Sequence, residues 1–135
     1  MSAVIAIRAL LIGSAPVTAI VPAARIVAGI VPQGAPLPAL SVMHISTVGE
    51  GAIDGQSAAT LSTSRVQITA MARDYPAVKA LLVVARLACN RKFGIIAGVS
   101  VVSILRDTVG PDFVSDDATI YYQTIDFKVT FHEPN

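Results

Sequence analysis

The amino-acid sequence predicts a single α+β domain: a small antiparallel or mixed sheet of about four to five strands, with two helices packed on one face. Three observations lead to this expectation. The 135 residues fall within the range of one domain and can close one hydrophobic core. Two segments repeat apolar residues at helical spacing, whereas others alternate apolar and polar residues as strands do. These segments follow one another in the order helix, strands, helix, strands, which is typical of α+β proteins.

The first expected helix covers residues 3–12, because Ser2 can cap it and Gly13 and Pro16 end it. Its packing face would consist of Val4, Ile7 and Leu11. Residues 17–38 then contain the prolines Pro22, Pro32, Pro36 and Pro38. Proline lacks a backbone donor, so we expect an extended connector across the surface, with at most a short strand at 25–31.

A strand is expected at 39–48, followed by a flexible loop at 49–64. This loop consists almost wholly of Gly, Ala, Ser and Thr, with Glu50 and Asp54, and is too long for a tight turn. Residues 65–73 alternate strictly, which predicts a half-buried strand with one apolar side made of Val66, Ile68, Ala70 and Ala72.

The second expected helix covers residues 74–92, between the start signals Asp74 and Pro76 and a stop at Gly94. Its packing face would be Val78, Leu81, Leu82, Ala85 and Cys89. Two strands complete the chain. Residues 95–106 are apolar on both faces, which predicts a strand that is central in the sheet or faces a neighbouring subunit. Residues 118–131 alternate as a half-buried strand does.

The composition points to oligomerisation. Charged residues make up only 14% of the chain, against roughly a quarter in ordinary globular domains. The apolar group reaches 53%, and the mean hydropathy is +0.66. Such a surface leaves apolar patches facing water, and these usually mark contacts with other chains. The net charge of +1, spread along the chain, gives no support for tight nucleic-acid binding.

The apolar segments do not predict export or membrane insertion. No basic residue precedes the apolar start at residues 2–19, and Arg8 interrupts it. Lys79 and Arg86 divide the most apolar later stretch, so we expect a soluble chain without a membrane span. Cys89 is the single cysteine, which excludes an internal disulfide, suits a reducing cytoplasm and is expected to be buried.

One segment has a weak likeness to a hydrolase site. Residues 55–59 partly resemble a nucleophile elbow around Ser57, and Asp107 or Asp116 followed by His132 gives the hydrolase chain order. However, Ala59 replaces the second glycine, and the segment does not join a buried parallel strand to a helix. We therefore expect no enzyme, and a small hydrolase using Ser57 stays as an alternative from another class.

No cofactor or metal site is expected. The glycines at 49–55 do not fit the dinucleotide fingerprint, and His44, His132 and Cys89 lack ligand spacing. The connection between the last two expected strands contains Asp112, Asp116 and Asp117, and we expect it to be a solvated loop. The C-terminal end of the second helix carries a partial negative charge, which is complemented by Arg86, Arg91 and Lys92. These three basic residues support at most transient contact with DNA.

Several motifs together resemble a known family. They are Arg25-Ile26, the proline-glycine stretch Val31 to Pro38, Asp54-Gly55 before Arg65 to Ile68, and the closing strand Tyr122 to Phe127. With the opening helix and the alanine-rich second helix, they resemble the small tail completion proteins of long-tailed phages and prophages. The resemblance covers nearly the whole chain.

The resemblance implies a structural virion protein without catalytic residues. Such a subunit caps a finished tail tube, commonly as a homo-oligomeric ring of six, and offers its other side to head connector proteins. It would be assembled in the host cytoplasm and lie at the head-proximal end of the tail. The alternative within assembly is a head completion or adaptor subunit of the same neck. The expected subunit and tube contacts are Glu50, Ile53, Asp54, Gln56, Leu61, Val99, Val101 and Val102.

Overall fold

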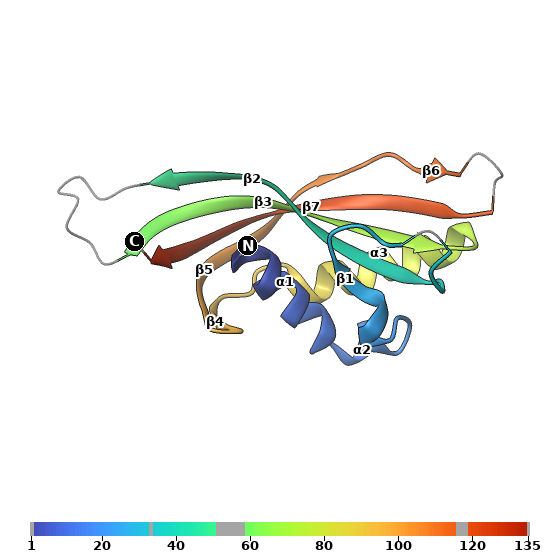
Figure 1. Ribbon diagram of the computed structural model, residues 1–135, viewed down its shortest axis with the longest axis horizontal. Coiled ribbons are helices and arrows are strands. Elements are labelled where there is room, and N and C mark those ends of the chain that lie inside the picture. The colour runs from blue at the N-terminus through green and yellow to red at the C-terminus, as the bar shows by residue number, and fades with distance from the viewer. Residues whose placement is uncertain (1, 33, 51–58, 116–118, 135) are drawn as a thin grey trace.

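The computed structural model describes residues 2–32, 34–50, 59–115 and 119–134. Two helices precede a first run of strands, one helix precedes a second run, and the strands form one mixed sheet (Figure 1). The helices are α1 (Ser2–Ile12), α2 (Ala15–Thr18) and α3 (Tyr75–Cys89), with a 3-10 turn at Ala23–Arg25. The strands are β1 (Ile26–Ala28), β2 (Ala39–Glu50), β3 (Ala59–Ala72), β4 (Gly94–Ile96), β5 (Val99–Val109), β6 (Phe113–Val114) and β7 (Tyr121–Pro134).

The sheet is larger than the sequence predicts. Its strands follow the order β1-β2-β3-β7-β5-β4, and β6 also pairs with β7, which makes seven strands among the described residues. Only β1 and β2 run parallel, so the sheet is mixed, and it twists strongly along its length (Figure 1). The α+β class is confirmed. The sequence underestimates the number of strands because β4 and β6 have only three and two residues, too few for a periodic signal.

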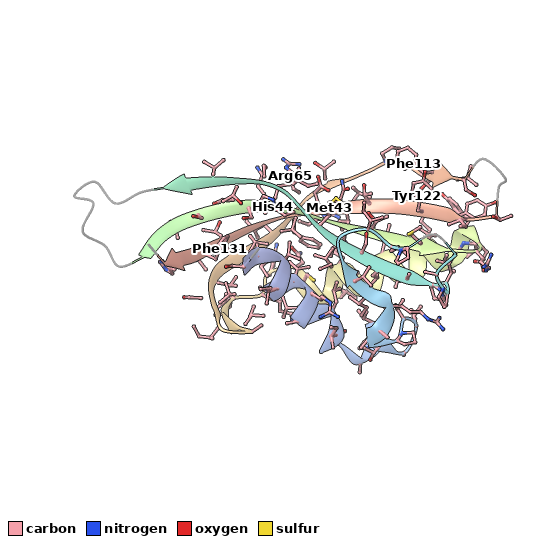
Figure 2. The ribbon with its side chains drawn as sticks, viewed as in Figure 1. Met43, His44, Arg65, Phe113, Tyr122 and Phe131 are labelled. Carbon is pink, nitrogen blue, oxygen red and sulfur yellow. The ribbon has the colours of Figure 1, made fainter. Side chains whose placement is uncertain are left out.

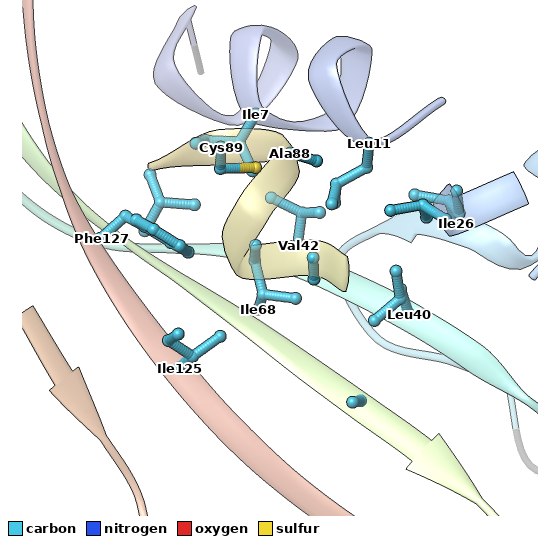
Figure 3. Close-up of a cluster of buried hydrophobic side chains, with 14 of the residues drawn as sticks. Ile7, Leu11, Ile26, Leu40, Val42, Ile68, Ala88, Cys89, Ile125 and Phe127 are labelled. Atoms are coloured by element: carbon cyan, nitrogen blue, oxygen red, sulfur yellow. The ribbon is translucent and has the colours of Figure 1, made fainter. Parts of the chain in front are cut away.

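The core lies between the sheet and the two main helices (Figure 3). The predicted packing faces of both helices are confirmed, since Val4, Ile7 and Leu11 of α1 are buried with Val78, Leu81, Leu82, Ala85 and Cys89 of α3. From the sheet, Val66, Ile68, Ala70 and Ala72 of β3 meet them, as the alternation predicts. Phe127 of β7, fully buried, is the largest side chain of this core.

The start of α3 agrees with the sequence, but its end does not. The Asp74 carboxylate caps the helix by accepting a hydrogen bond of 2.8 Å from the backbone N–H of Ala77. The helix ends at Cys89, and Arg91 turns the chain with a φ of +64°. Gly94 is therefore not the stop. It begins β4, where its own positive φ of +107° suits glycine.

The proline-rich connector is partly buried, which corrects the expectation of an extended surface crossing. The short strand β1 lies within the predicted range, but α2 and the 3-10 turn precede it. Val17, Val21 and Ile26 are fully buried in the core. Proline is tolerated in the first turn of a helix, so Pro16 starts α2 rather than preventing structure. The Arg8 Nε of α1 donates to the Ile26 carbonyl oxygen at 2.8 Å.

The predicted strand at 95–106 is a hairpin and is not central. β4 and β5 are joined at Ala97 and Gly98, which have positive φ values of +51° and +81°. β4 ends the sheet, and β7 lies between β3 and β5. The two-residue turn was missed because the apolar sequence runs through it without polar residues. Whether this strand faces a neighbouring subunit stays a prediction.

The predicted loop at 49–64 is strand at both of its ends. β2 continues to Glu50 and β3 begins at Ala59, so only residues 51–58 lie outside the described structure. Ser62 and Ser64 are each 1% exposed, which shows that small polar residues here are covered rather than flexible. Pairing of β3 with both β2 and β7 satisfies the backbone, and the segment needs no large apolar side chain to remain a strand.

Candidate assembly surfaces

The sheet extends beyond the helices as an arm, defined here as residues 44–50 of β2, 59–65 of β3 and 132–134 of β7. In Figure 1 the ends of these strands lie away from α2 and α3. A bulge at Ile45 interrupts the β2–β3 register between His44 and Ser46, where the strand enters the arm. On β2, Ile45 is 45% exposed and Val48 is 66% exposed. The arm therefore carries apolar side chains into solvent.

Two of the predicted contact residues lie at the end of this arm. Glu50 is the last residue of β2 and is paired with Leu61 of β3, whose side chain is half-buried. Ile53, Asp54 and Gln56 lie outside the described residues. The structure thus brings Glu50 and Leu61 together by strand pairing, and their role in assembly stays a prediction.

The other predicted contact residues belong to β5 and differ in exposure. Val101 is 4% exposed and lies in the core, and Val99 is half-buried against it. Val102 is 48% exposed because successive side chains of a strand point to opposite faces, and its neighbour Val101 faces the core. Of the three valines, Val102 is the one that reaches the surface of the monomer.

The sequence reasoning missed strongly exposed apolar residues at and near the same hairpin. Phe93 and Ile95 are 77% and 74% exposed, and Leu87 at the end of α3 is 64% exposed. We call Phe93, Ile95 and Val102 the hairpin surface. A usable signal was present, since residues 93–105 contain no charged side chain. Isolated exposed apolar residues are ordinary, but a run of them on an edge hairpin marks a site of contact.

A third surface is an apolar groove along α1. It has a volume of about 720 Å³ and lies between α1, β1 and the turn at Ala97. The only charged residue of α1 is Arg8, whose Nε is engaged by the Ile26 carbonyl. The groove is lined mainly by Val4, Ile5, Ala9, Ile12, Val27 and Ala28. Its lining suits an apolar group better than a charged one.

An ion-pair network crosses the face of the sheet opposite the helices. Arg65 of β3 contacts Asp107 of β5 at 2.6 Å and Asp126 of β7 at 3.1 Å. The Gln67 side chain donates to the other oxygen of Asp126 at 3.1 Å. Because Asp126 is only 9% exposed, these bonds compensate a carboxylate that is largely removed from water. The network ties three strands where the arm begins (Figure 2).

A second polar cluster holds the segment between β5 and β6 against α3. The Lys79 Nζ donates to Asp112 at 2.6 Å and to Gln123 at 2.7 Å, and the Tyr75 hydroxyl donates to Asp112 at 2.9 Å. The hydrogen bond to Asp112 raises the pKa of Lys79 above its usual value. The same hydrogen bond, with that of Tyr75, lowers the pKa of Asp112. Nearby, Phe113 stacks on Tyr122 with ring centroids 5.3 Å apart.

The structure does not assemble the hydrolase order considered from the sequence. Ser57 and Asp116 lie outside the described residues, and Asp107 is bound by Arg65. Asp107 lies next to Arg106, which pairs with Phe127 of β7. The exposed His132 is further along β7, so it lies about 17 Å from the position of Asp107. A different polar chain is present, in which His44 Nε2 and the Thr47 hydroxyl lie 2.6 Å apart and Thr47 meets the Ser64 hydroxyl at 2.7 Å. The burial of Ser64 leaves it unable to meet a substrate.

Metal and thiol chemistry find no support in the described part of the chain. No three His, Cys, Asp or Glu side chains there are grouped to hold a metal ion. Burial raises the pKa of the Cys89 thiol to about 12, so it stays protonated and is neither a nucleophile nor a ligand. The expectation that Cys89 is buried is confirmed. In the described residues, no helix has both the length and the apolar character needed to span a bilayer.

Comparison with known proteins identifies the family. The sequence model of a family described as tail completion protein gp17 matches residues 5–131. The chain belongs to this tail completion family. It is thus a structural component of the phage virion, in the tail, as the resemblance in the sequence implies. No curated protein matches the sequence.

A solved structure shows the same fold as this tail completion family member. The structure is described as the virion of a native gene transfer agent particle. Its matching chain has a TM-score of 0.70 and 14% sequence identity, over 98% of this chain and 94% of that chain. At this identity the likeness concerns the fold alone, and it extends over nearly the full length of both chains.

Proposed function

We propose that the chain caps the finished tail tube and joins it to the head connector proteins as a homo-oligomeric ring, six copies being the expected number. Membership of the tail completion family supports a structural role in the tail. The observation that carries the proposal is the presence of apolar side chains in solvent on two separate parts of the monomer. These are Ile45 and Val48 on the arm, and Phe93 and Ile95 on the hairpin surface.

Two different surfaces are what a closed ring requires. In a head-to-tail ring, each subunit presents one patch to the neighbour before it and another to the neighbour after it. Ile45 and Val48 of the arm belong to β2, near one edge of the sheet, whereas the hairpin surface lies at β4 and β5 on the other edge. Covering both would remove from water side chains that are now about half to three-quarters exposed.

The position in the virion belongs to the same proposal. The ring would lie at the head-proximal end of the tail after assembly in the host cytoplasm, with the tail tube on one side and the connector on the other. DNA passing through would make at most transient contacts, since the chain carries a net charge of only +1. A head completion or adaptor subunit is the alternative, and immunogold imaging of virions carrying the tagged chain separates the two positions.

The proposal is tested by measuring self-association. Light scattering and electron microscopy over a concentration series should reveal a closed ring for the unaltered chain, alone or with tail tubes. The variant Phe93→Ser/Ile95→Ser should assemble poorly while its melting temperature stays nearly unchanged, because both side chains are exposed. Ile30→Ser is the matched control, since Ile30 is 80% exposed and lies outside both surfaces. A chain that stays monomeric at every concentration and does not join tubes refutes the ring.

A further inference from the structure

The two edges of the sheet are open in the same half of the molecule. β1 covers β2 only at residues 40–42, where the Val42 carbonyl oxygen accepts from the Gly29 N–H at 2.9 Å. From Met43 onward, β2 pairs with β3 alone. On the other side, β4 ends the sheet and pairs with β5 alone. Backbone groups on both edges are therefore available to another strand.

The backbone of Ile95 points to the outside of the β4 edge. β4 and β5 are joined by a two-residue turn, residues 97–98, in which both φ values are positive. In such a hairpin the pair of residues beside the turn is hydrogen-bonded and the next pair is not. Ile95 and Ser100 are that next pair, so the N–H and C=O of Ile95 face away from β5. No other described backbone group bonds to them.

The two open edges lie at the same height across the sheet, as the strand registers show. One row of paired residues runs through five strands and consists of Gly49, Ser62, Phe131, Val101 and Gly94. Its ends are four inter-strand spacings apart, about 19 Å along the sheet. Because the sheet is open, the two edges of one molecule do not pair with each other. In Figure 1, β4 and the arm part of β2 lie at opposite margins of the same half of the molecule.

The two edges also match in direction and in side chains. Four antiparallel pairings separate β2 from β4, so these strands run in the same direction. Charged side chains protect many edge strands from pairing with other chains, but residues 41–49 and 93–105 contain no Asp, Glu, Lys or Arg. Beyond the bulge at Ile45, residues 46–49 pair regularly with β3 and form a straight edge. Val48 and Ile95 are 66% and 74% exposed there.

We propose that the β2 edge of the arm pairs with β4 of a second copy of this chain, so that one sheet continues from subunit to subunit. Neighbouring copies in a closed ring have no shift along the ring axis. With that axis along these strands, edges of equal height meet, and Val48 of one copy comes beside Phe93 of the next. The inference rests on the proposed function and names the contact that joins its subunits.

Backbone pairing explains how a chain with few charges selects its neighbour. An added strand satisfies donors and acceptors along the whole edge, so it recognises another open edge rather than any apolar surface. The register is fixed as well, because a slip of one residue would move Val48 to the opposite face of the sheet. Pairing also removes exposed apolar side chains of both edges from water.

Removing one backbone donor tests the pairing. Ile95→Pro keeps an apolar side chain but lacks the outward N–H, and edge strands tolerate proline at such positions. We expect it to raise the concentration for half-assembly by about ten-fold, measured by sedimentation velocity, because each contact loses one hydrogen bond. Ile95→Val is the matched control, since valine keeps the donor and should assemble nearly as the unaltered chain does. Equal assembly of the two variants would overturn the inference.

A cysteine pair tests which edges meet, and it does not depend on the folding of the proline variant. Under a mild oxidant, Val48→Cys/Phe93→Cys should form a ladder of linked chains on non-reducing gels, because paired strands bring neighbouring side chains within about 5.5 Å. The native Cys89 is buried and should not take part. Val48→Cys/Ile30→Cys is the control without a ladder, since Ile30 lies outside both surfaces.

The outcomes separate this inference from the ring itself. If the unaltered chain forms rings but the cysteine pair gives no ladder, the arm does not meet β4, and the ring stands without this contact. If the unaltered chain never assembles, both proposals fail. If residues 46–49 become protected from hydrogen exchange on tail tubes while no ladder forms between copies, the edge pairs with the tube and the inference is overturned. Circular dichroism melting shows whether each variant is folded.

Discussion

The same strands behave differently in the two halves of the sheet. Where α1 and α3 cover it, Val66 and Ile68 of β3 alternate with half-buried polar residues and build the core. In the arm, the same strand carries Ser62 and Ser64 on the corresponding side, and Val48 of β2 faces solvent. Continuous strand pairing supports both halves, but apolar burial stabilises only one. The arm is therefore free to serve contacts with other chains, while the covered half supplies the apolar core and the arm contributes strand pairing.

The largest effect should come from removing part of the arm. Deletion of residues 49–64 removes the start of β3, which pairs with β2 and β7, and leaves the end of β7 without one neighbour. We expect loss of cooperative thermal unfolding, measured by calorimetry. Deletion of 52–57 alone keeps every described strand residue and should change the free energy of unfolding by less than about 1 kcal/mol. Equal stability of the two deletions would show that the paired arm contributes nothing to folding.

A core substitution should distinguish the halves most directly. Phe127→Ala removes the largest fully buried side chain and should lower the free energy of unfolding by about 3–5 kcal/mol. Val48→Ala, in the arm, should change it by less than about 0.5 kcal/mol, because that side chain is mainly in solvent. Urea unfolding followed by circular dichroism measures both. A large loss for Val48→Ala would mean that the arm is packed in the monomer.

The ion-pair network at the boundary should have a smaller effect. Arg65→Met leaves Asp126 with only the hydrogen bond from Gln67, and we expect a loss of about 1–2 kcal/mol of unfolding free energy. Lys128→Met is the control, since this neighbouring lysine is exposed and has no ion pair among the described residues. Urea titration of both variants gives the difference. An identical loss of unfolding free energy for the two variants would mean that removing any positive charge from this face has the same effect.

The cluster at the start of α3 should give a weak dependence of stability on pH. The pKa of Asp112 is lowered in the folded state, so its contribution is present above the ordinary value of 3.8 and is lost as the pH falls through the folded value. Lys79 has a raised pKa, so its contribution is present below 10.5 and is lost at still higher pH. Asp112→Asn should return the pKa of Lys79 toward 10.5, which NMR titration measures. An unchanged Lys79 pKa would contradict the pairing.

The thiol should show the smallest effect. Because burial raises the pKa of Cys89 to about 12, native protein should not react with Ellman's reagent at pH 8, whereas urea-unfolded protein should react fully. The rate of labelling then reports opening of the covered half. Rapid labelling without denaturant would show that α3 leaves the sheet readily.

The candidate surfaces were only partly accessible to sequence reasoning. Val102 is exposed, but Val101, one residue away, is in the core because successive strand side chains face opposite sides of the sheet. Phe93 and Ile95 were missed because an apolar run predicts burial, and only the position of β4 at the sheet edge shows that they face water. Arg86 of α3 and Arg106 of β5 line one groove, although no spacing rule connects these two elements.

Periodicity and composition by themselves determined the α+β class, both main helices with their packing faces, the alternation of β3 and β7, and the burial of Cys89. These follow from short-range geometry, since a helix or strand aligns its apolar residues whatever surrounds it. Tertiary structure decided the extent of the strands at 49–64, the hairpin at 97–98 and the burial of Val17, Val21 and Ile26. There, partners distant in the sequence satisfy the backbone and cover the side chains, and no local pattern records them.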